Sequence, residues 1–214
     1  MGLRERKKAQ TRQLIADTAW RLFADRGFER VTVAQVAREA EVAVATVFNY
    51  FPTKEDLFFF PLEVFGADLV EAVAERAAGE PALAAFRRQL MEAGGLLGQV
   101  EAGDDQALER LRTMNRVIAD SPALQAREQQ AFTSTAAALA DRLAAGTGPG
   151  GLDARVAANA LVGVQRALVD YTRRRVLAEE RPAGLAADVR ALAERAFALL
   201  EDGLGDYGAQ PAGP

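Results

Sequence analysis

The sequence predicts an all-α protein: an N-terminal three-helix domain with a helix-turn-helix, followed by a C-terminal helical bundle that dimerises. Three observations in the first 57 residues predict the helix-turn-helix domain. Apolar residues recur at helical spacing, a capping-box pattern follows them, and two short helical segments are then separated only by Glu41 and Val42. Two short helices joined by a tight turn and braced by a longer one are typical of a helix-turn-helix.

The first predicted helix ends at Gly27. Four apolar residues recur along it at helical spacing and share one face: Ile15, Ala19, Leu22 and Phe23. Glycine is common directly after a helix because it adopts the left-handed backbone without steric cost. We therefore expect this helix to bury one face and to stop at Gly27.

A second helix is predicted from Thr32 to about Ala40. Thr32 and Gln35 have capping-box spacing, in which each side chain accepts a hydrogen bond from the other residue's backbone. Val31 and Val36 occupy the two positions of a hydrophobic staple. Both signals therefore predict that a helix begins at Thr32.

The third predicted helix, at about residues 43–51, has two different sides. At 100° per residue, Val47 and Phe51 fall on one side, whereas Ala45 and Asn49 point the opposite way. The apolar side is expected in the core, which leaves the other available, and an α-helix fits the major groove of DNA. The alternative is an ordinary short amphipathic helix, because an aromatic stripe is common in protein cores.

Several side chains on and after this helix suit contact with DNA. Apolar Val44 and small Ala45 match the methyl group of thymine, and Asn49 can pair with adenine or with a phosphate. Thr46 can donate to a phosphate. Lys54, in the first turn of a fourth predicted helix, adds a cation beside a helix N-terminus that already favours anions.

The net charge of −4 is unevenly distributed. Residues 1–12 carry one acidic side chain, Glu5, against five basic ones: Arg4, Arg6, Lys7, Lys8 and Arg12. Residues 1–57 carry ten basic and eight acidic side chains, and the remainder carries sixteen and twenty-two. A basic arm on an acidic body is expected where one end of a chain meets a polyanion, although a solvated terminus gives the same pattern.

Composition excludes much enzyme chemistry. The 214 residues are 50% hydrophobic, enough for a sizeable core, and include neither Cys nor His. Thiol and imidazole nucleophiles and zinc sites built on Cys or His are therefore absent, and we expect neither an enzyme nor a cofactor or metal site. No apolar run approaches the roughly 18 residues that span a membrane, and no signal-peptide core is present, so we expect a cytoplasmic protein.

Residues 8–57 closely resemble the DNA-binding domain of the tetracycline-repressor (TetR) family. The matching segments are residues 23–28, 31–37 and, above all, 46–57, which reads TVFNYFPTKEDL. The resemblance implies a role at or near DNA for eight positions: Thr32, Val44, Ala45, Thr46, Phe48, Asn49, Tyr50 and Lys54. With Arg4, Lys7 and Lys8 of the arm, these are the predicted DNA-binding residues.

Three positions depart from the family pattern. Glu41 stands where the family usually has Gly, Ala43 where it has Ser or a similar cap, and Phe48 where it commonly has Tyr. A left-handed Glu41 and an uncapped helix start would each cost about 1 kcal/mol. A helical ligand-binding or adaptor protein with weakened DNA binding is therefore the alternative function.

Residues 58–214 predict five or six further helices, and Pro61 is expected to kink the first of them. The expected breaks are at residues 79–81, 102–104, 121–122, 146–151 and 181–184. We thus expect a DNA-binding domain at residues 1–52, a ligand-binding and dimerisation domain at 53–205, and a flexible tail at 206–214.

The predicted helix at residues 153–176 is apolar almost all round between residues 156 and 164, apart from Asn159. Such a helix must be covered on all sides. The resemblance implies a homodimer in which this helix and the one at 186–203 meet their copies in a four-helix interface. A fully internal helix in a monomer is the alternative.

Three polar residues interrupt apolar stripes in the body and are candidate ligand contacts: Asn115, Thr135 and Gln165. We expect Asn115 and Gln165 to face one largely apolar cavity. Phe65, Met114 and Phe132 complete the predicted ligand-binding set, although each of the six also fits an ordinary core. The segment that begins with residues 116–124 looks like the family's acyl-CoA-binding type of domain. The resemblance implies a repressor that binds a palindromic operator as a dimer and is released by a small, largely apolar ligand.

Overall fold

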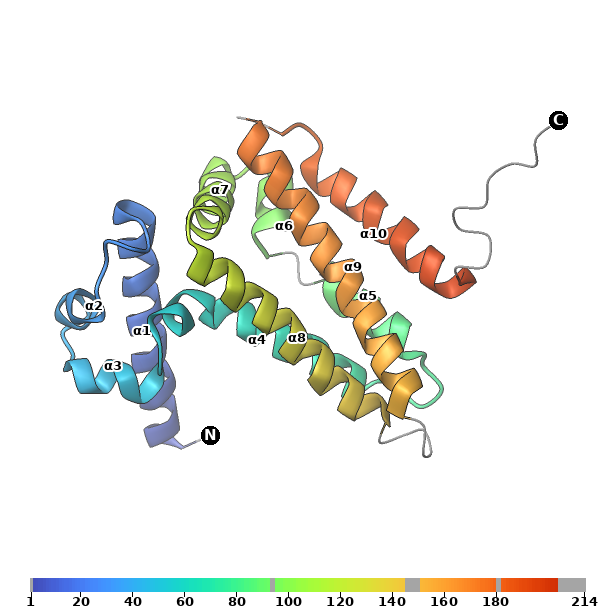
Figure 1. The fold of residues 1–214 in the computed structure, drawn as a ribbon, viewed down its shortest axis with the longest axis horizontal. Coiled ribbons are helices and arrows are strands. Elements are labelled where there is room, and N and C mark those ends of the chain that lie inside the picture. The colour runs from blue at the N-terminus through green and yellow to red at the C-terminus, as the bar shows by residue number, and fades with distance from the viewer. Residues whose placement is uncertain (1, 93–94, 145–150, 180–181, 204–214) are drawn as a thin grey trace. The chain divides into compact units, whose positions relative to one another are not determined.

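The computed structural model describes residues 2–92, 95–144, 151–179 and 182–203. Over these ranges the chain forms ten helices and no strand (Figure 1). They are α1 (Leu3–Arg26), α2 (Val33–Glu39), α3 (Val44–Tyr50), α4 (Lys54–Ala74), α5 (Ala82–Glu92), α6 (Gly95–Glu101), α7 (Asp105–Ala119), α8 (Pro122–Ala144), α9 (Gly151–Ala178) and α10 (Leu185–Asp202). The predicted all-α fold class is confirmed. Within the described ranges, every helix is too short or too polar to cross a bilayer.

The first three helices follow the predicted bounds, and the body differs from prediction in one respect. Seven described helices follow α3 rather than five or six, because α5 and α6 are described separately, with residues 93–94 outside the described ranges. The sequence has two adjacent glycines at 94–95, each of which disfavours helix by about 1 kcal/mol, and the predicted breaks do not include them. Most of the predicted loop at 146–151, and the predicted tail at 206–214, lie outside the described residues.

The chain packs as two compact units. The first contains the residues up to Asp68 together with Glu109–Thr135, and the second contains Leu69–Leu108 and the residues from Ala136 onward. Helices α4, α7 and α8 each contribute to both units. The expected boundary at residue 52 divides the chain by role rather than by packing, and it stays a prediction.

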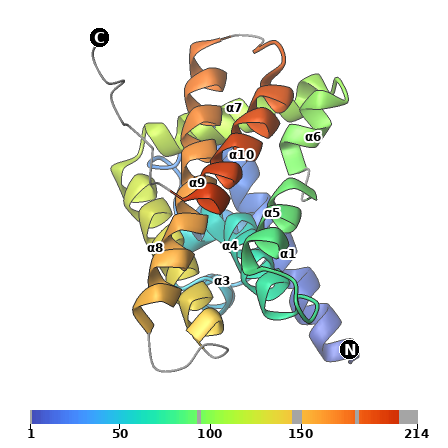
Figure 2. The ribbon, with the colours of Figure 1, turned by 90° about the vertical axis from the view of Figure 1, so that its right-hand side faces the viewer.

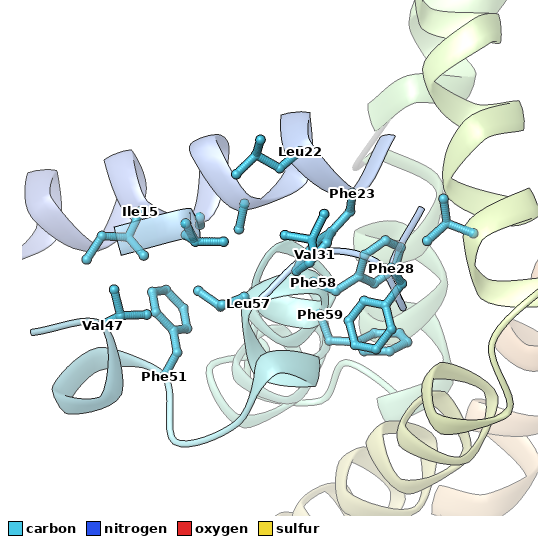
Figure 3. Packing of buried hydrophobic residues seen from close by; sticks show 14 of the residues in the cluster. Ile15, Leu22, Phe23, Phe28, Val31, Val47, Phe51, Leu57, Phe58 and Phe59 are labelled. Carbon is cyan, nitrogen blue, oxygen red and sulfur yellow. The ribbon is translucent and has the colours of Figure 1, made fainter. Parts of the chain in front are cut away.

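The core of the first unit joins the helix-turn-helix to the start of α4 (Figure 3). Phe23 and Phe28 lie with ring centroids 5.0 Å apart, and Phe58 and Phe59 of α4 lie 5.3 Å apart. All four rings are at most 3% exposed. Since burying one Phe side chain contributes about 1.5–3 kcal/mol, the first turns of α4 are an essential part of the N-terminal fold.

In the second unit, α9 and α10 lie side by side (Figures 1 and 2). One face of α9 is buried through Ala154, Ala158, Leu161, Val162, Val164, Gln165, Thr172 and Val176. Near the end of α9 and the start of α10, Arg175 donates to the Tyr171 hydroxyl at 2.6 Å and to Asp188 of α10 at 2.7 Å. The two predicted dimerisation helices therefore form one packed pair within each chain.

Candidate nucleic-acid interface

The start of α2 is fixed by its own residues. The Thr32 hydroxyl accepts a hydrogen bond from the Gln35 backbone N–H at 3.3 Å, and the Gln35 side chain accepts from the Thr32 N–H at 2.8 Å. Val31 and Val36, the two staple residues, are at most 1% exposed. The predicted capping box is confirmed, and the Thr32 hydroxyl assigned to DNA is engaged in it.

The turn between α2 and α3 is a Schellman motif. The Val42 N–H donates to the Ala37 carbonyl at 2.9 Å, and the Glu41 N–H donates to the Arg38 carbonyl at 3.2 Å. Glu41 has φ 54° and is the one non-glycine residue in the described ranges with a positive φ. Glycine normally takes this position, so Glu41 is in the left-handed conformation whose cost was considered from the sequence.

Helix α3 is held from one side by the core. Ala43 precedes it with extended backbone and makes no side-chain cap, as expected. Val47 is fully buried and Phe51 is 1% exposed, and both point into the cluster shared with α1 (Figure 3). Because local capping is missing, these two side chains supply the contacts that position α3.

The outward side of α3 is apolar and uncharged. Ala45 and Asn49 are exposed, and Val44 and Phe48 keep 41% and 49% of their surface accessible. Thr46 and Tyr50 lie half-buried at the flanks, with Tyr50 packed against the core. The two-sided helix predicted from the sequence is thus present. Its outer face offers apolar contact and one amide, but no cation.

Lys54 has partners within the protein. Its Nζ donates to the Phe28 carbonyl at 3.1 Å and lies 4.0 Å from the centroid of the Phe28 ring. Thr53 and Asp56 cap α4 reciprocally, with backbone-to-side-chain distances of 3.0 and 3.2 Å. Lys54 therefore ties the start of α4 to the segment after α1, and its contact with DNA stays a prediction.

The predicted basic arm is the beginning of α1. Arg4, Lys7 and Lys8 are exposed on its first turns. Further along the same helix, the Arg12 guanidinium lies 4.3 Å from the ring centroid of Phe60 and 5.4 Å from that of Phe51. Arg12 thereby links the basic end of α1 to the residue that ends α3, a cation–π contact with no signal in the sequence pattern.

Two long-range contacts hold the N-terminal helices onto α7 and α8 within the first unit. Arg127 donates to Asp56 at 3.1 and 3.2 Å, and Ser121 donates to Glu29 at 2.7 Å. These partners are 71 and 92 residues apart, so no local pattern could reveal them. The ion pair lies in an open cleft lined by Thr53, Glu55, Asp56, Ala123, Ala126, Arg127 and Gln130, none of which was a predicted ligand contact.

Five of the six predicted ligand-binding residues belong to the first unit: Phe65, Met114, Asn115, Phe132 and Thr135. Asn115 is 3% exposed and its Nδ2 donates to the Leu111 carbonyl at 2.8 Å, while Met114 packs against the core cluster. Gln165 belongs to the second unit, where it is 8% exposed and its Oε1 has no hydrogen-bond partner among the residues that the structure describes. Among the six, Gln165 shows the clearest need for a partner.

Comparison with known proteins connects this helical arrangement to gene regulation. Residues 15–59 match the family described as bacterial regulatory proteins, tetR family. A relative, the HTH-type transcriptional regulator TcmR of Streptomyces glaucescens, is 31% identical over 125 residues, which cover 58% of this chain and 54% of TcmR. The chain thus spans little more than half the length of this relative.

Solved structures share the fold over most of the chain. NalD of Pseudomonas aeruginosa, described as the secondary repressor of the MexAB-OprM multidrug efflux pump, has a TM-score of 0.53 at 20% identity and covers 90% of this chain and 96% of its own. SmeT, solved as a complex with triclosan, has a TM-score of 0.57 at 19% identity and covers 96% and 99%. The helical architecture beyond the helix-turn-helix is therefore also a known one.

Proposed function

Because the chain belongs to the TetR family of bacterial transcriptional regulators, we propose that it is a cytoplasmic repressor that binds a palindromic operator as a dimer and is released by a small, largely apolar ligand. The observation that carries the DNA-binding part is the geometry of α3. This helix is anchored inward by Val47 and Phe51 and presents Ala45 and Asn49 outward. An outward helix face of this kind can enter the major groove.

The dimer is supported by the exposed side of α9. Leu152 is 72% exposed and Val156, one turn later, is 60% exposed, although the helix buries its opposite face in its own unit. A second copy related by a two-fold axis would cover both residues with the same surface of its own α9. Sedimentation at micromolar concentration tests this, and a monomer that does not dimerise on DNA would contradict it.

The ligand proposal rests on Gln165. A buried amide oxygen without a donor is costly, so a ligand that offers a hydroxyl or an N–H group would gain by binding there. The surrounding face of α9 is apolar, which favours a ligand that is mostly hydrocarbon or aromatic with one donor group. Drug-like phenols and acyl-CoA-like thioesters are two classes to screen.

Selection of bound DNA from a random pool with the purified protein tests the central proposal. We expect enrichment of an inverted repeat whose half-site centres are about 34 Å apart, so that two copies of α3 enter successive major grooves. We also expect binding to weaken as salt rises, because Arg4, Lys7 and Lys8 would neutralise phosphates.

The strained Glu41 and the uncapped Ala43 favour one alternative, a helical ligand-binding or adaptor protein with weakened DNA binding. The same selection separates the two functions. If no sequence is enriched and no DNA band shift is seen even at low salt, the adaptor function is favoured over the repressor function.

Release by ligand has its own test. Ligand must weaken operator binding by the same factor by which operator weakens ligand binding. Replacing Gln165 by Leu should abolish the response while leaving operator affinity without ligand within a few-fold. If this variant responds normally to an identified ligand, Gln165 belongs to the structural core.

A further inference from the structure

Two large apolar side chains on α3 are exposed one helical turn apart. Val44 is 41% exposed and Phe48 is 49% exposed, on a helix of only seven residues. Two other large apolar side chains, Val47 of α3 and Phe51 directly after it, are at most 1% exposed. The core therefore buries the inward residues of this segment, whereas Val44 and Phe48 remain exposed to solvent.

The chemistry of this face argues against phosphate as that partner. The residues of α3 read VATVFNY and include no charged side chain. Glu41, three residues before the start of α3, is exposed and acidic and would repel phosphate oxygens. The exposed cations Arg4, Lys7 and Lys8 lie on a different helix, α1. The cations that suit phosphate contact therefore lie on α1, whereas α3 offers apolar contact.

On this basis, and resting on the proposed operator binding, we propose that Val44 and Phe48 read the C5-methyl groups of thymine in each half-site. In the major groove, the C5-methyl of thymine is the apolar group that a base pair presents, whereas the other markers are hydrogen-bond donors and acceptors. Exposed valine and phenylalanine side chains gain from covering that methyl and gain little from the polar markers.

Spacing adds a constraint on the operator. Residues four positions apart are separated by about 6 Å along a helix axis, and successive bases by about 3.4 Å, so the two side chains reach thymines about two steps apart. Ala45, small and exposed, permits close approach between them. Asn49 lies on the same outward side, where its amide can pair with the adenine of a T·A pair.

Replacing thymine by deoxyuridine in the selected operator tests the inference, because this change removes only the methyl group. At one or two positions in each half-site, the change should lower the protein's affinity for the operator about fourfold per methyl. When the same position is changed in both half-sites, the affinity should fall about fifteenfold, because each methyl is a unit of buried apolar surface. Deoxyuridine outside the half-sites should change affinity by less than about 1.5-fold, within ordinary measurement scatter.

Variants then assign the methyl contacts to residues. In the Phe48→Ala and Val44→Ser proteins, the loss caused by deoxyuridine at the matching position should shrink to less than twofold, because no methyl or ring of the side chain then reaches the thymine methyl. Val64→Ala, which truncates a 46% exposed valine on α4, is the matched control and should keep the full deoxyuridine effect.

The outcomes are distinguishable. If an operator is selected but tolerates deoxyuridine at every thymine, the methyl inference is wrong and the repressor proposal survives. The same holds if Phe48→Ala, Val44→Ser and Val64→Ala all keep an equal deoxyuridine effect. If no sequence is enriched at all, the proposed function fails, and the methyl inference fails with it.

Discussion

Helices α2 and α3 are each seven residues long and adjacent in the chain, but they are held in place by different means. α2 begins at a reciprocal capping box between Thr32 and Gln35. α3 has no side-chain cap and follows Glu41, which occupies a left-handed conformation. Both helices bury apolar side chains, but α2 adds a capping box of its own, whereas α3 has packing without a side-chain cap.

The difference matters for function. Isolated helices of this length are unstable in water, so each must be stabilised by caps or by packing. α3 gains its stability from Val47 and the following Phe51 on one side, which leaves the residues of its other side free to vary with the DNA sequence. The outer residues of α3 can therefore be replaced without removing the packing contacts that hold the helix.

The largest effect is expected from Phe51→Ala. This change removes a 1% exposed ring from the core behind α3 and should lower the free energy of unfolding by about 3–5 kcal/mol. Urea unfolding of the two proteins measures it. Phe48→Ala is the control and should cost less than about 0.5 kcal/mol, as surface changes usually do. Similar losses for both would mean that packing does not anchor α3 on the Phe51 side.

Thr32→Ala tests whether caps hold α2. Without its hydroxyl the capping box loses the bond to the Gln35 N–H, and unfolding should become easier by about 1 kcal/mol. Thr32→Ser keeps the hydroxyl and should restore most of that loss. An Ala variant as stable as the wild type in thermal unfolding would remove the distinction between the two helices.

Glu41→Gly should stabilise the protein by about 1 kcal/mol, because glycine adopts the left-handed backbone without a Cβ clash. The control lies two residues away. Glu39→Gly places glycine inside α2 and should destabilise by about 1 kcal/mol. Changes of the same sign in the two variants, measured by chemical unfolding, would be inconsistent with the strained turn.

Ala43→Ser is expected to have the smallest effect. A serine hydroxyl before α3 can accept a backbone N–H from its first turn and should add about 0.5–1 kcal/mol of stability. Ala45→Ser, within the helix and exposed, supplies no cap and should change stability by less than about 0.5 kcal/mol. A gain from Ala45→Ser equal to that from Ala43→Ser would show that capping is not the cause.

Much of the N-terminal region was predictable because its signals are local. The capping box, the left-handed Glu41 and the two sides of α3 all follow from residues within four positions of one another. The cation–π contact of Arg12 and the partners of Lys54 were not predictable, since they depend on tertiary packing over tens of residues. The Arg127–Asp56 pair lies beyond any sequence pattern for the same reason.

The body was predictable only in outline. The predicted breaks at residues 79–81, 102–104 and 121–122 fall at the ends of described helices, whereas no break was predicted between α5 and α6. Polar residues on apolar stripes gave a set of ligand candidates, but a stripe cannot tell a satisfied core amide from a binding group. The structure distinguishes two of them: the Asn115 side chain donates to the Leu111 carbonyl, whereas the Gln165 oxygen has no donor within the described part of the chain.

The affinity of the Asn49→Ala protein for the selected operator and for random DNA tests most directly whether α3 reads bases. Asn49 is exposed, so its truncation should leave the free energy of unfolding within about 0.5 kcal/mol of the wild type. Operator affinity should fall by about tenfold or more while affinity for random DNA stays nearly unchanged, as expected when a base contact worth about 1–3 kcal/mol is lost. An equal loss on both DNAs, or no loss on either, would contradict base reading by α3.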